Sequence, residues 1–167
     1  ENQRTPLHYA CELGNRNIIK ELLDQGAKCN IDKYGETPLH RLCEEGLFGP
    51  YYNYHDDDFN EDMYEYTYDE IVKSLIKAGC DINAVTQGLS GRRVCLENPI
   101  QRNVSGLALA LINNGADVNY KDKDNKTHLQ NALFYSSQFN PRGPIPNEEI
   151  VLTLIEKGAD INFIDFD

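Results

Sequence analysis

The segment from Arg4 to Asn30 contains a pattern that returns three more times before the C-terminus, and such a repeat restricts the fold more than any other feature of the sequence. Its first anchor, Thr5-Pro6-Leu7-His8, recurs unchanged at Thr37-Pro38-Leu39-His40 and in altered form at Thr127-His128-Leu129-Gln130. Its second anchor runs from glycine to asparagine and occurs at 26–30, 79–83, 115–119 and 158–162. The chain is therefore expected to fold as a series of similar units.

An amphipathic helix is predicted directly before each of these glycines. The apolar side chains keep the same places relative to the glycine, with spacings of one, four and five that form one stripe along a helix. They are Ile18, Ile19, Leu22, Leu23; Ile71, Val72, Leu75, Ile76; Leu107, Ala108, Leu111, Ile112; and Ile150, Val151, Leu154, Ile155. These second helices are expected at about 17–25, 68–78, 105–114 and 147–157.

The anchors also explain where helices begin and end. Thr5 and Thr37 can cap a first helix, and Pro6 and Pro38 then occupy its first position, where a missing N–H costs little. A first helix is expected at about 6–12, and another at about 127–134. The repeated glycine ends each second helix at a position with positive φ, where any side chain is penalised.

These motifs resemble those of the ankyrin repeat family, whose signature combines G-x-T-P-L-H-x-A, a turn, a second helix ending in two leucines, and G-A-D-x-N. The resemblance runs from Gln3 to about Asp165. It implies an all-α solenoid of stacked helix-turn-helix units with short β-hairpin connections, in one domain over 1–167. The repeats are expected at about 2–33, 34–86, 87–122 and 123–167. Both ends fall at repeat boundaries, so we expect a segment of a longer chain.

Two repeats are longer than the first. Thr5 lies 21 residues before Gly26 but Thr37 lies 42 before Gly79, which predicts an insertion of 21 residues between the two helices, at roughly 47–66. The fourth repeat carries 10 additional residues, including a proline-rich loop at 139–146. The resemblance implies that both loops leave the same edge of the solenoid, which is often the binding face.

The third repeat is the most eroded, and two registers fit it. In the preferred register Gly88 and Ser90 replace the turn glycine and the threonine, although Arg92 then falls on the usual leucine and Pro99 would stop the helix. In the alternative, residues 98–101 replace T-P-L-H. That register puts the extra residues in the preceding hairpin and shortens the helical part.

The longer insertion is acidic and rich in tyrosine, and residues 47–66 contain no lysine or arginine. One interpretation is a solvated surface loop, which costs little entropy to tolerate. The other is a docking element for a basic protein, since tyrosine is enriched at interfaces. The candidate partner-binding residues are Tyr51, Tyr52, Tyr54, Asp56, Asp57, Asp58, Phe59, Tyr64 and Tyr66, with Phe139 and Arg142 from the second loop.

Neither a metal nor a cofactor is predicted. Asp56, Asp58, Asn60 and Asp62 follow the start of an EF-hand loop. The match fails at the two diagnostic positions, because the sixth is Glu61 instead of glycine and the twelfth is Thr67 instead of glutamate. A cation bound by the clustered carboxylates alone stays an alternative. A zinc site is a second alternative, from histidine and cysteine three residues apart at 8–11 and 40–43. The resemblance instead implies that these histidines bond the neighbouring turn.

The composition limits which classes of partner and which cellular compartment are expected. The formal net charge of −11 disfavours nucleic acid and anionic membrane surfaces and favours a basic protein partner. No apolar run approaches 18 residues, so no membrane span is predicted. The five cysteines have no paired spacing, which argues against a disulfide framework and for a reducing compartment. We expect an intracellular, cytoplasmic protein, in the host cytoplasm if the source is an intracellular microbe or virus.

Two function classes follow. The sequence has no nucleophile elbow and no phosphate-binding glycine loop, so this segment is not expected to be an enzyme. The first class is a protein–protein interaction scaffold. The second is a targeting or substrate-recognition domain of a larger enzyme or host-directed effector. The resemblance also implies that Asn30, Asn83, Asn119 and Asn162 hold the hairpin position that asparagine hydroxylases modify in some family members. The oligomeric state is not predicted.

Overall fold

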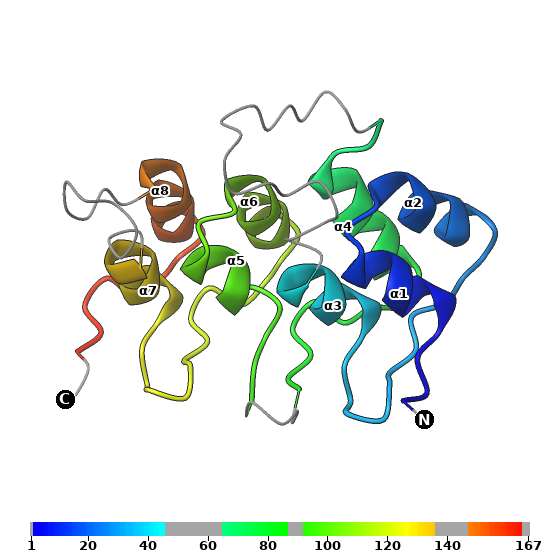
Figure 1. Cartoon of the computed structure of the whole chain (residues 1–167). Helices are drawn as coiled ribbons and strands as arrows, with labels where there is room; N and C mark the ends of the chain where they lie inside the picture. Colours follow the sequence, from blue (N-terminus) through cyan, green and yellow to red (C-terminus); the bar gives the residue numbers. More distant parts are fainter. Residues whose placement is uncertain (1, 46–64, 87–91, 136–146, 165–167) are drawn as a thin grey trace, which may run out of the picture.

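The computed structural model describes residues 2–45, 65–86, 92–135 and 147–164, which form eight helices in two layers (Figure 1). One layer contains α1 (Pro6–Glu12), α3 (Pro38–Glu44), α5 (Glu97–Gln101) and α7 (His128–Tyr135). The other contains α2 (Arg16–Asp24), α4 (Tyr68–Lys77), α6 (Ser105–Asn113) and α8 (Glu148–Glu156). The predicted stack of helix pairs is confirmed, and the six helices for which a range was predicted have bounds within two residues of it. The exact division into repeats stays a prediction.

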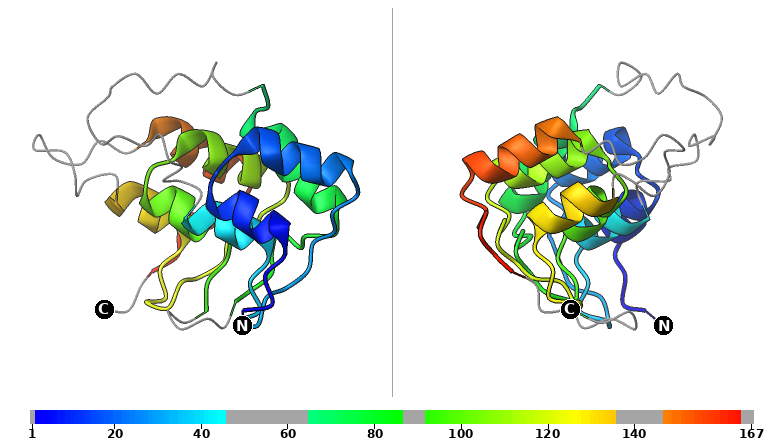
Figure 2. Two further views of the ribbon diagram at one scale, coloured as in Figure 1. Left: turned by 45° about the vertical axis from the view of Figure 1, so that its right-hand side comes forward. Right: turned by 90° about the vertical axis from the view of Figure 1, so that its left-hand side faces the viewer.

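The four helix pairs follow one another along the stack, so the two ends of the chain lie at opposite ends of it (Figure 1). The connections between successive pairs extend together to one side of both layers (Figure 2). In the described residues their only β-pairing is two isolated bridges, Thr86 with Arg93 and Lys121 with Thr127. No helix in the described ranges is long and apolar enough to cross a membrane.

Side-chain caps fix the starts of several helices, including α2, α3 and α4. In α3 the Thr37 hydroxyl accepts a hydrogen bond from the His40 N–H at 3.3 Å, and His40 Nδ1 accepts one from the Thr37 N–H. α4 has the same reciprocal arrangement between Thr67 and Glu70. α2 is capped by Asn15, whose side chain accepts from the Ile18 N–H at 3.1 Å. Each cap satisfies N–H groups that the helix itself leaves without partners.

The second helix of each pair ends at the repeated glycine, as predicted. Gly79 has a φ of +99°, and its N–H donates to the Ile76 carbonyl at 2.9 Å while the next N–H, of Cys80, donates to Leu75 at 3.0 Å. The other three repeated glycines adopt the same conformation. This motif closes the helix and turns the chain toward the next pair, which is why the spacing of the glycines sets the spacing of the units.

The core is one continuous layer of apolar side chains between and within the pairs. The predicted stripe is buried in α4 and α6, as Ile71, Leu75 and Leu107 illustrate. In α2 the stripe is only partly covered, because Leu22 is half-buried and Ile18 is exposed. The stripe therefore marks the faces that meet other pairs, and the first pair has no described pair in front of it.

The preferred register of the third repeat is wrong. Residue 92 belongs to the connection that pairs Thr86 with Arg93, and α5 begins only at Glu97. The extra residues lie before this helix and the helix is short, as in the alternative register, but it starts two residues earlier than Pro99. Burial of Leu96 and Ile100 fixes this position. Pro99 falls in the first turn, where its missing N–H removes no helical hydrogen bond.

The expectation of no disulfide is also wrong, because Cys29 is bonded to Cys80 with their Cα atoms 5.1 Å apart. The two cysteines are separated by 51 residues, and stacking of the first two pairs brings them together. The inference of a reducing compartment loses this support. Cys11, Cys43 and Cys95 are free and buried.

Candidate interaction surface

The histidines of the T-P-L-H motifs connect neighbouring helix pairs. His8 Nδ1 accepts from the Thr5 N–H at 3.1 Å, and its Nε2 lies 3.1 Å from the Glu36 carbonyl oxygen of the next connection. His40 repeats this arrangement, with Nε2 3.0 Å from the Ala84 carbonyl oxygen. The geometry requires the proton on Nε2. Both ring nitrogens are therefore used for hydrogen bonds, which assigns these histidines a structural role in place of zinc binding.

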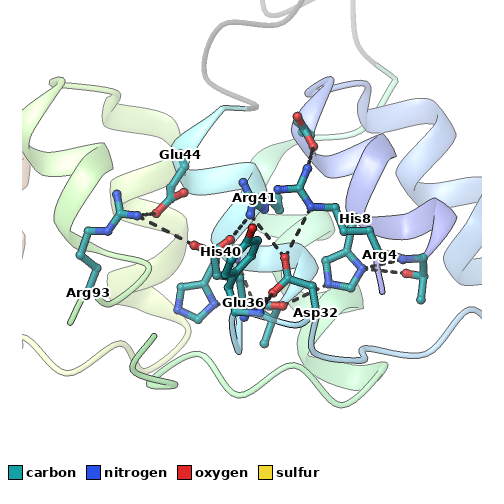
Figure 3. A network of polar contacts seen from close by, with 12 residues as sticks. Arg4, His8, Asp32, Glu36, His40, Arg41, Glu44 and Arg93 are labelled. Atoms are coloured by element: carbon teal, nitrogen blue, oxygen red, sulfur yellow. Dashed lines mark hydrogen bonds and ion pairs between the residues drawn. The ribbon is translucent and has the colours of Figure 1, made fainter. Parts of the chain in front are cut away.

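A network of alternating charges runs along the side of the first layer near the connections (Figure 3). It begins with Arg4, which contacts Glu12 at 2.8 Å and Asp32 at 3.4 Å. The Asp32 carboxylate also accepts a hydrogen bond from Arg41 Nη2 at 3.3 Å. Burial raises the pKa of Asp32, but its hydrogen bonds from backbone N–H groups and from Arg41 outweigh burial, so the net pKa lies below the usual value. Asp32 is thus a buried carboxylate that stays ionised.

The network continues into the third pair. Arg41 forms an ion pair with Glu36, and Arg93 contacts Glu44 at 2.7 Å and Glu36 at 3.9 Å. Burial raises the pKa of Glu44, and Arg93 opposes this effect. Three arginines from three successive units therefore hold carboxylates between them, and the charges are mostly paired within the protein.

A cleft of about 360 Å³ opens over this network. It is lined by Arg4, Tyr34, Glu36, Arg41, Glu44, Glu45 and Arg93, among others. Glu45 is exposed and directly precedes residues 46–64, which contain most of the acidic insertion. The last described residue before the insertion, Glu45, is thus part of the cleft lining.

The chain returns from the insertion beside α2. Arg16 is buried, its Nη1 donates to the Tyr66 carbonyl at 3.2 Å, and its guanidinium lies 3.7 Å from the centre of the Tyr68 ring. Lys20 lies 5.3 Å from the centre of the Tyr66 ring. Such contacts are cation–π interactions, which are stronger when desolvated. They fix the C-terminal end of the insertion against the first pair.

Of the predicted partner-binding residues, the structure describes Tyr66 alone. Its half-buried ring faces Lys20 of α2, so Tyr66 holds the end of the insertion in place. The other predicted residues lie outside the described residues and stay predictions. They are Tyr51, Tyr52, Tyr54, Asp56, Asp57, Asp58, Phe59, Tyr64, Phe139 and Arg142.

Sequence reasoning missed the charged network, although the repeat spacing contained a signal for it. Asp32 lies five residues before Thr37, and Arg41 lies four after it. In the fourth repeat the same spacings lead to Asp122 and Asn131, and the Asn131 amide donates to the Asp122 carboxylate at 2.8 Å. Comparing these two positions between repeats would have predicted the contact.

Comparisons with known proteins agree with the fold. A family model described as ankyrin repeats (three copies) matches residues 1–51. The probable 26S proteasome regulatory subunit p28 of Saccharomyces cerevisiae is 28% identical over 142 residues, which cover 82% of this chain and 52% of the yeast protein. The putative ankyrin repeat protein FPV223 of fowlpox virus is 51% identical over 41 residues, which cover 24% of this chain and 29% of the viral protein.

Together, the repeated motifs, the stack of helix pairs and these matches support an ankyrin repeat family, and the fold is an ankyrin-type solenoid. Ankyrin repeats form a protein-binding scaffold, so the chain is a protein–protein interaction module. It spans about half the length of the yeast relative and less than a third of the viral one.

Proposed function

We propose that this module binds a basic segment of another protein, using the cleft and the acidic, tyrosine-rich insertion together. The observation that carries the proposal is their continuity: Glu45 lines the cleft and leads directly into residues 46–64. The net charge of −11 supports a basic partner, since complementary charge steers association. The proposal gives the module itself no catalytic activity.

The cleft and the insertion contribute differently to the proposed binding, because their charges are arranged differently. In the cleft, Arg41 and Arg93 are held by carboxylates of the protein, which leaves the exposed Glu45 as a contact for a cation. In the insertion, carboxylates supply the long-range attraction and tyrosines supply contact area. Exposed charges mainly raise the association rate, whereas desolvated aromatic side chains mainly lower the dissociation rate.

A lysine-rich peptide that also carries leucines is a suitable probe, and the same peptide with glutamate in place of lysine is its control. Replacing residues 47–66 by the turn 14–16 should weaken binding of the lysine peptide sharply. The triple change of Asp56, Asp57 and Asp58 to asparagine should slow association and flatten its salt dependence. Changing Tyr51, Tyr52 and Tyr54 to alanine should speed dissociation.

The matched control for the aspartate variant changes Glu148, Glu149 and Glu156 of α8 to glutamine, which removes the same charge away from the cleft. This variant should bind as the unchanged protein does. An equal loss of binding in both variants would show that binding depends on the net charge of the protein and not on the position of these three aspartates. Unaltered affinity after the loop replacement would remove the insertion from the site, and Glu45→Gln would then test the cleft alone.

A second candidate function is a targeting or substrate-recognition part of a larger enzyme, assembly or host-directed effector. It is favoured by the yeast relative, which is named as a proteasome regulatory subunit and is about twice as long as the matched part of this chain. A cytoplasmic location, in a host cell for an effector, belongs to this candidate. A full-length sequence that contains no domain besides ankyrin repeats would argue against this second function.

A further inference from the structure

Three polar side chains meet in the interior between the second and third helix pairs. Cys43 and His40 lie on α3, and Cys95 lies two residues before α5, which packs against α3. All three are buried, with exposed fractions of 1% for each cysteine and 2% for His40. The Cys43 thiol donates a hydrogen bond to the Cys95 sulfur, and the His40 ring hydrogen-bonds the same sulfur. We call Cys43 and Cys95 the buried thiol pair.

The buried thiol pair lies at a joint between helix pairs, as the disulfide does. Cys29 and Cys80 join the first two pairs, whereas the buried thiol pair connects the second pair with the third and is not bonded. Cys11 holds the same repeat position as Cys43, six residues after the motif threonine, and is also free and buried. Burial raises the pKa of Cys11. Cys11 therefore serves as an internal reference for a buried thiol.

The hydrogen bonds give the two thiols of the pair different protonation. Burial raises the pKa of the Cys95 thiol, but the hydrogen bonds from Cys43 and His40 outweigh burial and hold the pKa at about 6. Burial and the bond to Cys95 both raise the pKa of Cys43. Burial lowers the pKa of His40, and its bond to Cys95 more than reverses this effect. At neutral pH a thiolate, the nucleophilic form of cysteine, is therefore in contact with a thiol.

We infer that the buried thiol pair is a peroxide-reactive site, in which hydrogen peroxide oxidises Cys95 and Cys43 then closes a disulfide to it. In the first step the Cys95 sulfur attacks one peroxide oxygen. An S–O bond forms, the O–O bond breaks, and hydroxide leaves as water after taking up the proton that Cys95 had released.

The second step joins the two residues of the pair. The Cys43 sulfur attacks the Cys95 sulfur, an S–S bond forms and the S–O bond breaks. The oxygen leaves as a second water, which includes the proton of the Cys43 thiol. Overall the two sulfurs lose two electrons and the peroxide gains them, so two thiols and one peroxide give one disulfide and two waters.

Burial restricts which oxidant can react. Both sulfurs are almost completely covered, so a bulky disulfide such as oxidised glutathione cannot reach them, whereas hydrogen peroxide is little larger than water. Cys95 lies three residues after the exposed Arg92, in the connection before α5, and a local opening of that connection is sufficient for entry. The new bond would join the two ends of the chain segment that includes the acidic insertion.

Peptide mapping of the folded protein tests the site. The protein is treated with a small excess of hydrogen peroxide, quenched, unfolded, alkylated and digested with trypsin. We expect the peptides of Cys43 and Cys95 to be recovered as one cross-linked species that lacks the two thiol hydrogens, while Cys11 is recovered alkylated. Absence of this cross-link, or a cross-link between Cys43 and Cys11, would overturn the inference.

Two serine variants at the same repeat position separate the thiols. Cys11→Ser should leave the cross-link unchanged. Cys43→Ser keeps a hydroxyl that can hydrogen-bond Cys95 but cannot form the disulfide, so peroxide should leave a sulfenic acid on Cys95, which dimedone labels as the protein is unfolded. Circular dichroism checks that each variant folds, and Cys43→Ala takes the place of Cys43→Ser if the buried hydroxyl prevents folding. A folded Cys43 variant whose Cys95 stays an unmodified thiol would contradict the proposed site.

The pH dependence of the oxidation rate tests the thiolate itself. With a pKa of about 6, Cys95 is almost fully ionised at pH 7, so the rate should stay nearly constant from pH 7 to pH 8.5 and be about tenfold lower at pH 5. The other titratable groups that face the pair are His40, Asp81 and Glu44. An ordinary thiol, with a pKa of about 8.5, would react roughly 15-fold faster at pH 8.5 than at pH 7. A rise of that size would overturn the inference.

Oxidised glutathione provides the last comparison. In the folded protein it should consume Cys43 and Cys95 far more slowly than hydrogen peroxide at the same concentration, because it cannot enter the interior. In protein unfolded by urea both reagents should reach every thiol. Equal rates for the two reagents in the folded protein would mean that the thiols react only after the protein unfolds, and the site would then not exist in the native state.

Discussion

The joint between the first two helix pairs and the joints after it are held by different chemistry. At the first joint Cys29 is bonded to Cys80, and the Cys29 N–H donates to the Ala78 carbonyl at 3.0 Å. At the two later joints the side chains of Asn83 and Asn119 make paired hydrogen bonds to the next turn. The two kinds of link use neighbouring positions of the turn, since Cys29 lies three residues after its glycine and Asn83 lies four after its own. Of the two, the disulfide alone is sensitive to reductants.

The buried aspartates of the second and fourth repeats also have different partners. In the second repeat the buried Asp32 is held by the charged Arg41, and in the fourth the equivalent Asp122 is held by the neutral amide of Asn131. Removing a charge partner in a buried site costs more than removing a neutral one. The N-terminal half should therefore be the half that responds most strongly to substitution and to redox conditions.

Reduction of the disulfide should have the largest effect. The bond closes a loop of 51 residues, and the chain-entropy relation assigns such a loop about 4 kcal/mol of stability. Urea unfolding with and without a reductant measures the difference. Cys80→Ser should reproduce the loss and make the protein insensitive to the reductant. Asn83→Ala is the matched change at the next joint and should cost about 2 kcal/mol. An equal response at both joints would remove the contrast.

Leu75→Ala should cost about 3 to 4 kcal/mol, because Leu75 is fully buried where three pairs meet. Leu22→Ala at the equivalent place in α2 should cost about half as much, since Leu22 is only half-buried. Chemical denaturation of the two variants gives both numbers. A larger loss at Leu22 would mean that the first pair is better packed than its exposure suggests.

Arg41→Ala should cost about 3 kcal/mol, because it leaves the carboxylates of Asp32 and Glu36 buried without their shared cation. Asn131→Ala should cost about 1 kcal/mol, since it removes a neutral hydrogen bond to Asp122. The two variants are compared by their denaturation midpoints. Similar losses would show that Arg4, which also contacts Asp32, compensates for the missing guanidinium.

The sequence predicted the repeated part of the fold because each repeat carries its own local signals. Thr37 marks the start of α3 by its side-chain cap, and Gly79 marks the end of α4 by its positive φ; any copy of the motif carries the same signals. Cys29 and Cys80 carry no such signal, since their contact depends on how two units stack. α5 was misplaced because it lacks the threonine cap, and burial of Leu96 decides its start.

The candidate site was less predictable for the same reason. The acidic insertion was recognisable by composition, but its attachment to α2 through Arg16 is a contact between residues 50 positions apart. The cleft combines side chains from three units, so no single stretch of sequence contains it. Tyr66 matched the composition of an interface, yet its ring is turned toward Lys20.

The last prediction concerns His128, which occupies the place of the motif proline in α7. Burial lowers its pKa to about 4, against 6.5 in the unfolded chain. Because the unfolded state binds the proton more readily, stability should fall as the pH drops from 6.5 toward 4, by about 2 kcal/mol between pH 7 and pH 5. Glu44 and Glu97 act in the opposite direction, since burial raises the pKa of each and folded protein then gains protons.

The contribution of His128 is therefore isolated by a variant. His128→Pro restores the T-P-L pattern at the first position of α7, where the missing N–H costs little, and removes the titrating group. The unchanged protein should lose about 2 kcal/mol more than this variant between pH 7 and pH 5, measured by urea unfolding at both values. Identical pH dependence would show that His128 is protonated in the folded state, and the contrast with the charge-paired N-terminal half would then not extend to pH.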